Sequence, residues 1–239
     1  MPGWQALHEE FADEGFSVVT VALDLLPEKA TPWIHAAAPT HPALIDSAHL
    51  SDELFGFNNV PMAVWIDESG TLVRPAASAS IEGRRTTTVP DHLPDPVKAL
   101  IAEAGRIPDI ASEYRAAVVD WIQKGSESRF ALSPHQVIEH SLPRDRSHAE
   151  AAAEFELGQH LYQSVGRSAA VPHWRRAHNL DPSNWTYKRQ AWTLETTAEG
   201  APSDLMQPAT EIYDGNWLSD VLAAGGGEQY ITIPHDLEK

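Results

Sequence analysis

The sequence of 239 residues contains no cysteine. This absence excludes a disulfide, a thiolate metal ligand and a thiol nucleophile within these residues. It does not identify a compartment, because a reducing cytosol tolerates free cysteines and an oxidising space does not require disulfides. Any redox chemistry based on thiols would therefore need cysteines from outside these residues.

Basic residues and long apolar runs are also scarce. Lys and Arg number 17 against 34 Asp and Glu, which gives a formal net charge of -17. A chain this acidic repels nucleic-acid phosphates and anionic lipid surfaces, so we predict no nucleic-acid partner. No window holds the roughly 18 or more apolar residues of a membrane-spanning helix, and the start lacks the order of a signal peptide. We expect these residues to be soluble, without a membrane span.

What is present in the first 60 residues is an alternation of helix and strand signals. "FSVVTVAL" is β-branched and apolar, which predicts a strand buried on both faces of a parallel sheet. "LSDELFGF" predicts a helix with Ser51 as its N-cap and with Leu54 and Phe55 facing inward. The predicted order, which favours an α/β sheet, is helix 2–14, strand 16–23, a short helix ending before Pro39, strand 43–46 and helix 51–57.

A β-hairpin follows, and helices dominate the rest of the chain. "VPMAVWIDESGTLVRP" alternates apolar and polar positions around the turn "DESG", and the chain enters it through Pro61. Residues 75–96 predict an irregular loop, because they are rich in Ser, Thr, Ala and Pro. We predict later helices over 97–104 and 110–123 and from His148 onward.

The helical part carries the spacing of one tetratricopeptide repeat, a unit of two antiparallel helices. Small residues of the pattern permit close helix contact and large ones fill the gap, although Glu154 stands where the repeat usually has Trp. "NWTYKRQAWTLE" predicts a helix that caps the pair. The matching positions are Leu157, Gly158, Leu161, Ala170, Trp174, Ala177 and Pro182. We divide the chain into an α/β domain over 1–125, a linker over 126–147 and a helical region with its tail over 148–239.

The motifs that carry chemistry are weak. His135, Glu139 and His140 are one residue away from an H-x-x-E-H zinc signature, and a solvated loop or helix end explains them better. The pairs Asp52–Glu53 and Asp67–Glu68 fit solvated carboxylates that support the backbone locally, at a helix start and in a turn. There is no nucleophile elbow and no glycine-rich phosphate loop after the first strand. We therefore assign no catalytic residue, no metal ligand and no cofactor.

The order of "VALD", "ALID", "LFGFNNVP" and "MAVWIDESGTLV" resembles thioredoxin-fold redoxins of the TlpA/ResA-like group. The likeness covers residues 1–75, and a subset of that group continues into a tetratricopeptide-like part. It implies that Pro61 is the family's cis-proline and that Val60 offers backbone groups to a substrate beside the redox centre. It also implies a thiol–disulfide oxidoreductase or peroxiredoxin-like activity, with proteins carrying thiols or disulfides as partners.

This chain differs from the family in lacking the redox motif. The family carries Trp-Cys-x-x-Cys between a strand and its first helix, where the helix dipole lowers the thiolate pKa. "MPGW" looks like a later step of that helix, so we expect the strand and the cysteines to lie upstream of Met1. This chain is then an incomplete thioredoxin-like domain, inactive in dithiol exchange.

An alternative is a redox-inactive binding or scaffold protein that uses the cis-proline face or the helical repeat. The resemblance leaves the compartment open, since many relatives are exported or anchored to membranes.

Overall fold

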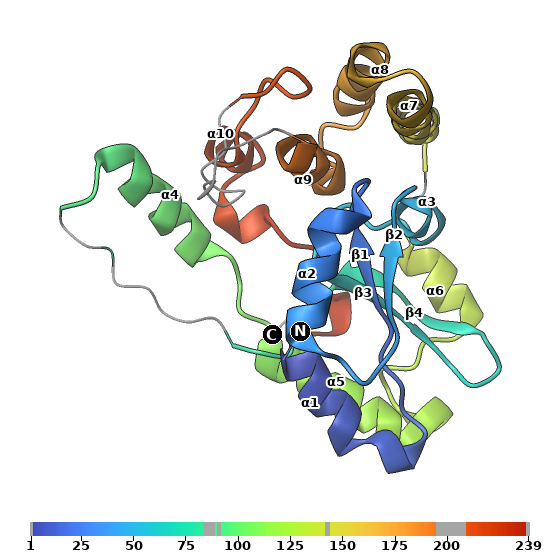
Figure 1. Ribbon diagram of the computed structural model, residues 1–239. Coiled ribbons are helices and arrows are strands. Elements are labelled where there is room, and N and C mark those ends of the chain that lie inside the picture. The colour runs from blue at the N-terminus through green and yellow to red at the C-terminus, as the bar shows by residue number, and fades with distance from the viewer. Residues whose placement is uncertain (1, 84–88, 90–91, 142–143, 195–208, 238–239) are drawn as a thin grey trace.

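The computed structural model describes residues 2–83, 89, 92–141, 144–194 and 209–237 (Figure 1). Within these ranges the protein is mixed α/β, mostly helical, with two small sheets of two strands each. None of the described helices combines the length and the apolar character needed to cross a bilayer. The mixture of helix and strand confirms the predicted α/β class.

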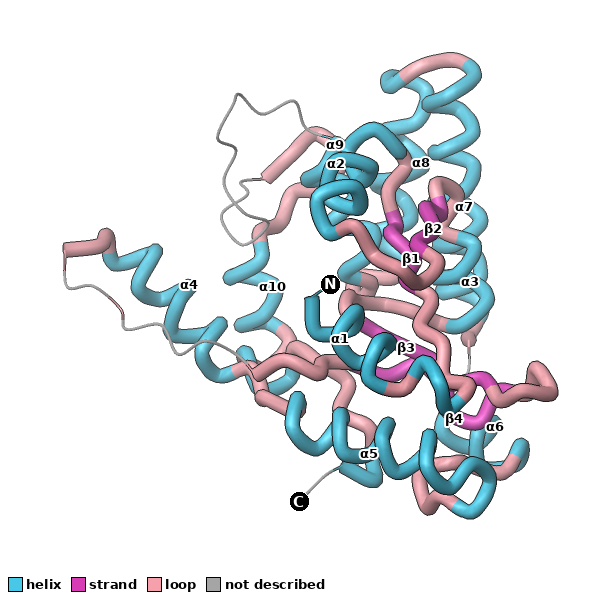
Figure 2. The backbone as a smooth tube through the Cα atoms, turned by 60° about the horizontal axis from the view of Figure 1, so that its bottom comes forward, coloured by secondary structure: helices cyan, strands magenta, loops and turns pink. Residues whose placement is uncertain are grey.

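The strands form two separate ribbons that lie next to each other in both views (Figures 1 and 2). β1 (Thr20–Leu23) pairs in parallel with β2 (Ala43–Asp46), and α2 (Pro27–Ala37) connects them. β3 (Met62–Ile66) pairs antiparallel with β4 (Leu72–Ser78). The parallel pair and the hairpin follow the predicted order of elements.

The hairpin turn is built by one carboxylate. The Asp67 side chain accepts hydrogen bonds from the backbone N–H groups of Ser69, at 2.9 Å, and Thr71, at 2.8 Å. Gly70 takes the left-handed conformation that closes the turn, with φ 82°. Asp67 therefore has the local structural role that the sequence predicts for it.

One hydrophobic core lies between the hairpin, α1 (Pro2–Glu10) and α5 (Ala111–Lys124). Leu7 of α1 and Phe11, the residue after the helix, are buried in it, as their spacing predicts. The indole N–H of Trp65 donates to the hydroxyl of buried Tyr114 at 2.9 Å, so the one polar group of that indole is satisfied inside the core.

A second core lies within the helical part, where α7 (Arg146–Ser164) packs along α8 (Arg167–Leu180). Trp174 of α8 is fully buried against Gly158 of α7. α9 (Trp185–Leu194) covers the pair and confirms the predicted third helix. The remaining described α-helices are α4 (Asp95–Arg106), α6 (Pro134–His140) and α10 (Trp217–Ala223), together with α3 (Leu50–Phe55).

The C-terminal segment returns to the hairpin. The backbone N–H of Ser78 in β4 donates to the carbonyl of Thr232 at 3.0 Å, and the carboxylate of Asp236 pairs with the buried guanidinium of Arg74. Further along the same strand, the N–H of Leu132 donates to the carbonyl of Val73 at 2.9 Å. One edge of β4 is thus covered by chain from the predicted linker and from the C-terminal tail.

Two predictions about burial are wrong. β1 begins at Thr20, and the side chain of Val21 is 40% exposed rather than buried on both faces. A ribbon of two strands is too narrow to have both faces covered by helices, so apolar side chains remain in contact with solvent.

The short helix α3 packs on the opposite face from the one predicted. Leu54 is 75% exposed and Phe55 is also exposed, whereas Asp52 is buried. Ser51 is not the N-cap, because the helix begins at Leu50 and His49 precedes it. With six residues the helix is shorter than two turns, so its apolar spacing alone does not fix which face is buried.

Replacing Gly158→Ala tests the contact between α7 and α8. A Cβ at this position would lie 2.5 Å from Cδ1 of Trp174, which is fully buried and has little room to move. We expect the free energy of unfolding, measured by urea denaturation, to fall by about 1–3 kcal/mol. The matched control is Gly105→Ala on the exposed face of α4, where a Cβ meets nothing within 4 Å. That change should be neutral or stabilise by up to about 1 kcal/mol; equal effects of the two substitutions would contradict the close contact.

Candidate functional site

The candidate site lies where the parallel strands end and the helical part packs against them (Figure 1). β2 ends at Asp46, a short turn follows, and α3 begins at Leu50. Ligands of open α/β sheets bind beyond the carboxyl ends of the strands, because loops and helix starts gather there. Here α7 and α9 pack against α3 and against the turn before it. These two helices form the other side of the site.

Asp46 fixes the turn before α3. Its carboxylate accepts hydrogen bonds from the backbone N–H and the hydroxyl of Ser51, each at 2.7 Å, and from the N–H of Ala48 at 3.2 Å. Partial burial alone would raise the pKa of Asp46, but these hydrogen bonds outweigh it and lower the pKa. Asp46 therefore stays ionised and holds the next residues in place.

The turn presents His49 in a left-handed conformation, with φ 55°. Its side chain is only 4% exposed, and the ring packs edge-on against Phe155 of α7 with 5.0 Å between the ring centres. Nδ1 lies 2.9 Å from the amide nitrogen of Gln159, whereas Nε2 has no hydrogen-bond partner among the described residues. Burial lowers the pKa of His49 to about 4, so the imidazole is neutral at pH 7.

Asp52, in the first turn of α3, is the second buried polar group. Its side chain is 6% exposed, and the hydroxyl of Thr186 on α9 donates to its carboxylate. Burial raises the pKa of Asp52 to about 7, although the hydrogen bonds from Thr186 and Asn184 act in the opposite direction. Strongly shifted pKa values gather at functional sites, and two of them occur here within one turn of chain.

A cavity of about 160 Å³ opens between these residues and α7; we call it the Asp52 cavity. His49 and Asp52 line it from α3 and the preceding turn, and Tyr187 lines it from α9. On α7 the lining includes three alanines, whose small side chains leave the space open: Ala149, Ala152 and Ala153. A larger, open depression on α8 is less suited to a site, because its residues Arg175 and Arg176 already pair with carboxylates.

The sequence-predicted residues Val60 and Pro61 lie at the head of β3 and do not line the Asp52 cavity. Their peptide bond is cis, as expected. Val60 is 39% exposed; its N–H donates to the side-chain oxygen of Asn59 at 2.8 Å, and its carbonyl accepts no hydrogen bond from the described residues. The Asn59 amide in turn donates to the carbonyl of Tyr230 at 3.0 Å.

Asp52 was predicted to be a solvated residue at a helix start, and its burial overturns that prediction. The residues that bury it come from α7 and α9, far along the chain, so no local pattern reveals the site. A histidine and an aspartate directly after a strand were the available signal. His135 and Glu139, the pair nearest to a zinc motif, lie exposed on α6 with Nδ1 and Oε2 3.7 Å apart.

The substitution Asp52→Asn tests the buried carboxyl group through the pH dependence of stability. The native pKa of about 7 exceeds the ordinary value of 3.8, so between these values the native protein holds a proton that the unfolded chain releases. Rising pH therefore destabilises the wild type through this group, and the asparagine variant lacks this loss. All other titratable groups are common to the two proteins, so the comparison isolates the contribution of Asp52.

The free energy of unfolding, measured by urea denaturation, is compared between Asp52→Asn and wild type. The difference, variant minus wild type, should rise by roughly 3 kcal/mol as the pH is raised from about 4 to about 8. The control Glu68→Gln, on the exposed hairpin, should follow the wild type at every pH. A difference between Asp52→Asn and wild type that does not change with pH would contradict the raised pKa.

Comparisons with families of related sequences, with curated proteins and with solved structures found no match to this chain.

Proposed function

We propose that the chain is the body of a thioredoxin-fold redoxin, of the thiol–disulfide oxidoreductase or peroxiredoxin-like class, whose redox cysteines lie outside these residues. The observation that carries the proposal is the pair of open strand edges. Among the described residues, no backbone hydrogen bond joins the free edge of β1 or the free edge of β3 to another segment. One further strand between the two ribbons would pair both edges and unite them in a single sheet.

The order of elements supports this proposal. In the resemblance described above, the strand that leads to the redox cysteines is absent from this chain, and it belongs at the centre of the sheet. The open edges of β1 and β3 fit a strand at that place. The cis bond before Pro61 fits the same scheme, since it stands at the head of β3.

The proposed role of the described residues is to hold a polypeptide substrate. The carbonyl of Val60, which accepts no hydrogen bond from the described residues, can accept one from the N–H of an extended chain, which is how a strand adds to an edge. The loop before Val60 is held in place by α9, because the N–H of Trp185 donates a hydrogen bond to the carbonyl of Asn58 at 2.7 Å. The thiol chemistry itself needs cysteines that this sequence lacks.

Insulin reduction with dithiothreitol tests the redox part of the proposal. The 239-residue chain has no thiol and should show no activity above the reagent alone. The DNA directly upstream of Met1 should encode a strand followed by Trp-Cys-x-x-Cys in the same frame. A protein that includes this extension should reduce insulin, and replacing both cysteines by serine should abolish the activity. An in-frame stop codon close to Met1, without such codons, would contradict the proposal.

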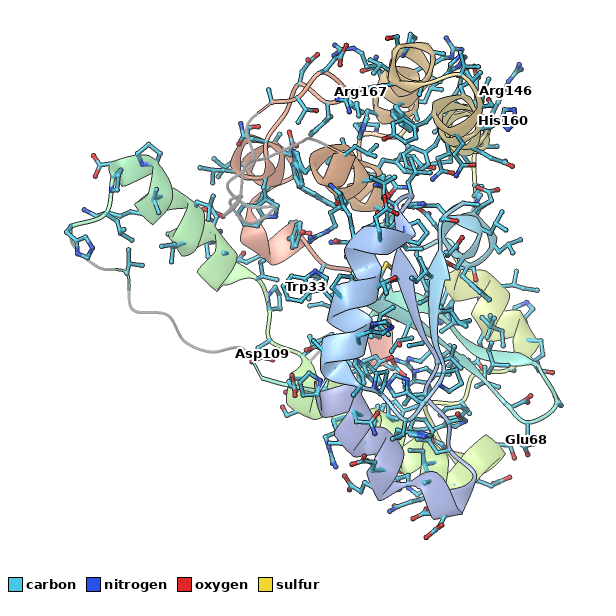
Figure 3. All side chains as sticks on the ribbon, viewed as in Figure 1. Trp33, Glu68, Asp109, Arg146, His160 and Arg167 are labelled. Atoms are coloured by element: carbon cyan, nitrogen blue, oxygen red, sulfur yellow. The ribbon has the colours of Figure 1, made fainter. Side chains whose placement is uncertain are left out.

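The second candidate is a redox-inactive binding protein that uses the Val60–Pro61 face. The observation that favours it is the complete absence of cysteine from a chain whose Val60 carbonyl accepts no hydrogen bond within the part that the structure describes. A photoreactive amino acid at position 60 should then crosslink a polypeptide partner, whereas the same group at Glu68, on the exposed hairpin turn (Figure 3), should not. Equal crosslinking at the two positions would contradict this candidate.

A further inference from the structure

We propose that His8 and His41 together bind a divalent transition-metal ion of the kind that imidazole nitrogens prefer, such as Zn²⁺, Ni²⁺ or Cu²⁺. His8 lies on α1, and His41 lies in the loop before β2. The inference goes beyond the proposed redoxin function, because it uses neither thiols nor the Val60–Pro61 face. It rests on two buried nitrogens without partners, on the distance between the two rings and on the hydrogen bonds that hold them in place.

A backbone carbonyl fixes the tautomer of His41. Nδ1 lies 3.1 Å from the carbonyl oxygen of Pro42, which can only accept a hydrogen bond, so Nδ1 carries the proton. Nε2 therefore presents a lone pair. It has no hydrogen-bond partner among the described residues, although the side chain of His41 is only 4% exposed. Metal-binding histidines characteristically donate their second ring N–H to a carbonyl or carboxylate in this way.

His8 supplies a second nitrogen without a partner. Its Nδ1 is buried and makes no hydrogen bond to any residue that the structure describes, while the side chain as a whole is partly exposed. Buried polar atoms nearly always have a partner, so two such nitrogens on neighbouring rings indicate a shared one. A metal ion or a water molecule can join two imidazole nitrogens, and the net charge of -17 favours the cation.

The distance between the rings fits one shared ion. The ring centres of His8 and His41 are 5.7 Å apart, with the ring planes at 85°. Imidazole nitrogens bind Zn²⁺ at about 2.0–2.1 Å, which places the centres of two rings on one ion roughly 5–6.5 Å apart. Within the described ranges, no group of three or more histidine and acidic side chains could hold a metal ion. Two imidazoles are therefore the protein ligands, and water completes the coordination.

Hydrogen bonds between α1 and the loop hold the two rings in this arrangement. The amide of Gln5, one turn before the histidine of α1, donates to the hydroxyl of Thr40 at 2.6 Å. The backbone N–H of Thr40 donates to the side-chain oxygen of Gln5 at 2.9 Å. The Pro42 carbonyl, which orients the other ring, also accepts from the N–H of Thr20 in β1 at 3.0 Å. Such preorganisation lowers the entropic cost of binding.

Titration of Zn²⁺ into the intact 239-residue protein tests the proposal, with the nitrogen-15 NMR shifts of the histidine rings as the measurement. Nδ1 of His8 and Nε2 of His41 should shift together and saturate, because both bind the same ion. Nδ1 of His41 should keep its proton, since it donates to Pro42. Mg²⁺, which prefers oxygen ligands, should leave both rings unchanged.

Three variants separate the shared site from scattered binding to surface histidines. His8→Gln and His41→Gln each remove one ligand and should weaken Zn²⁺ binding at the remaining ring by at least about tenfold. The matched control is His135→Gln, at an exposed histidine beside Glu139 on α6, and it should leave the affinity at the two rings unchanged. His8 is partly exposed, so His8→Gln keeps the proposal testable if His41→Gln fails to fold.

Three outcomes would overturn the inference. They are ring shifts that do not saturate with Zn²⁺, saturation at only one of the two rings, and unchanged affinity at His41 in the His8→Gln variant. Any of these would mean that the two rings share no metal ion, and that water satisfies their nitrogens.

Discussion

A buried hydrogen bond from Thr186 to the carboxylate of Asp52 joins the two parts of this protein. Asp52 lies on α3 of the α/β part and Thr186 on α9 of the helical part, 134 positions apart in the sequence. A buried carboxylate is unfavourable without such a partner, so removing α9 would leave α3 with an unsatisfied charge. The α/β part and the helical part therefore depend on each other for a well-formed site.

A single segment connects the cavity to the cis-proline. α3 leads into a short loop that ends at Pro61, and α9 holds this segment at both ends. Near its start, the side chain of Thr186 contacts Asp52; near its end, the backbone of Trp185 contacts Asn58. Adjacent residues of α9 thus position both the Asp52 cavity and the loop that presents Val60.

The sequence predicted the order of the elements better than their burial. Apolar periodicity and turn residues located the β1–β2 ribbon, the β3–β4 hairpin and the helices α7, α8 and α9, because these signals are local. Burial depends on partners distant in the sequence: α7 and α9 cover Asp52, while the narrow β1–β2 ribbon leaves Val21 partly in solvent. The candidate site was missed for the same reason, since the environment of His49 comes from Phe155 and Gln159 on α7.

The pKa of the Asp52 side chain tests the central claim, that the helical part buries this carboxyl group at the end of the parallel strands. The carbon-13 shift of the carboxyl carbon, followed by NMR as the pH is raised, reports the pKa directly. Burial predicts a midpoint of about 7. A midpoint near the ordinary value of 3.8 would show that Asp52 is solvated. That result would contradict the burial of Asp52 between the α/β part and the helical part.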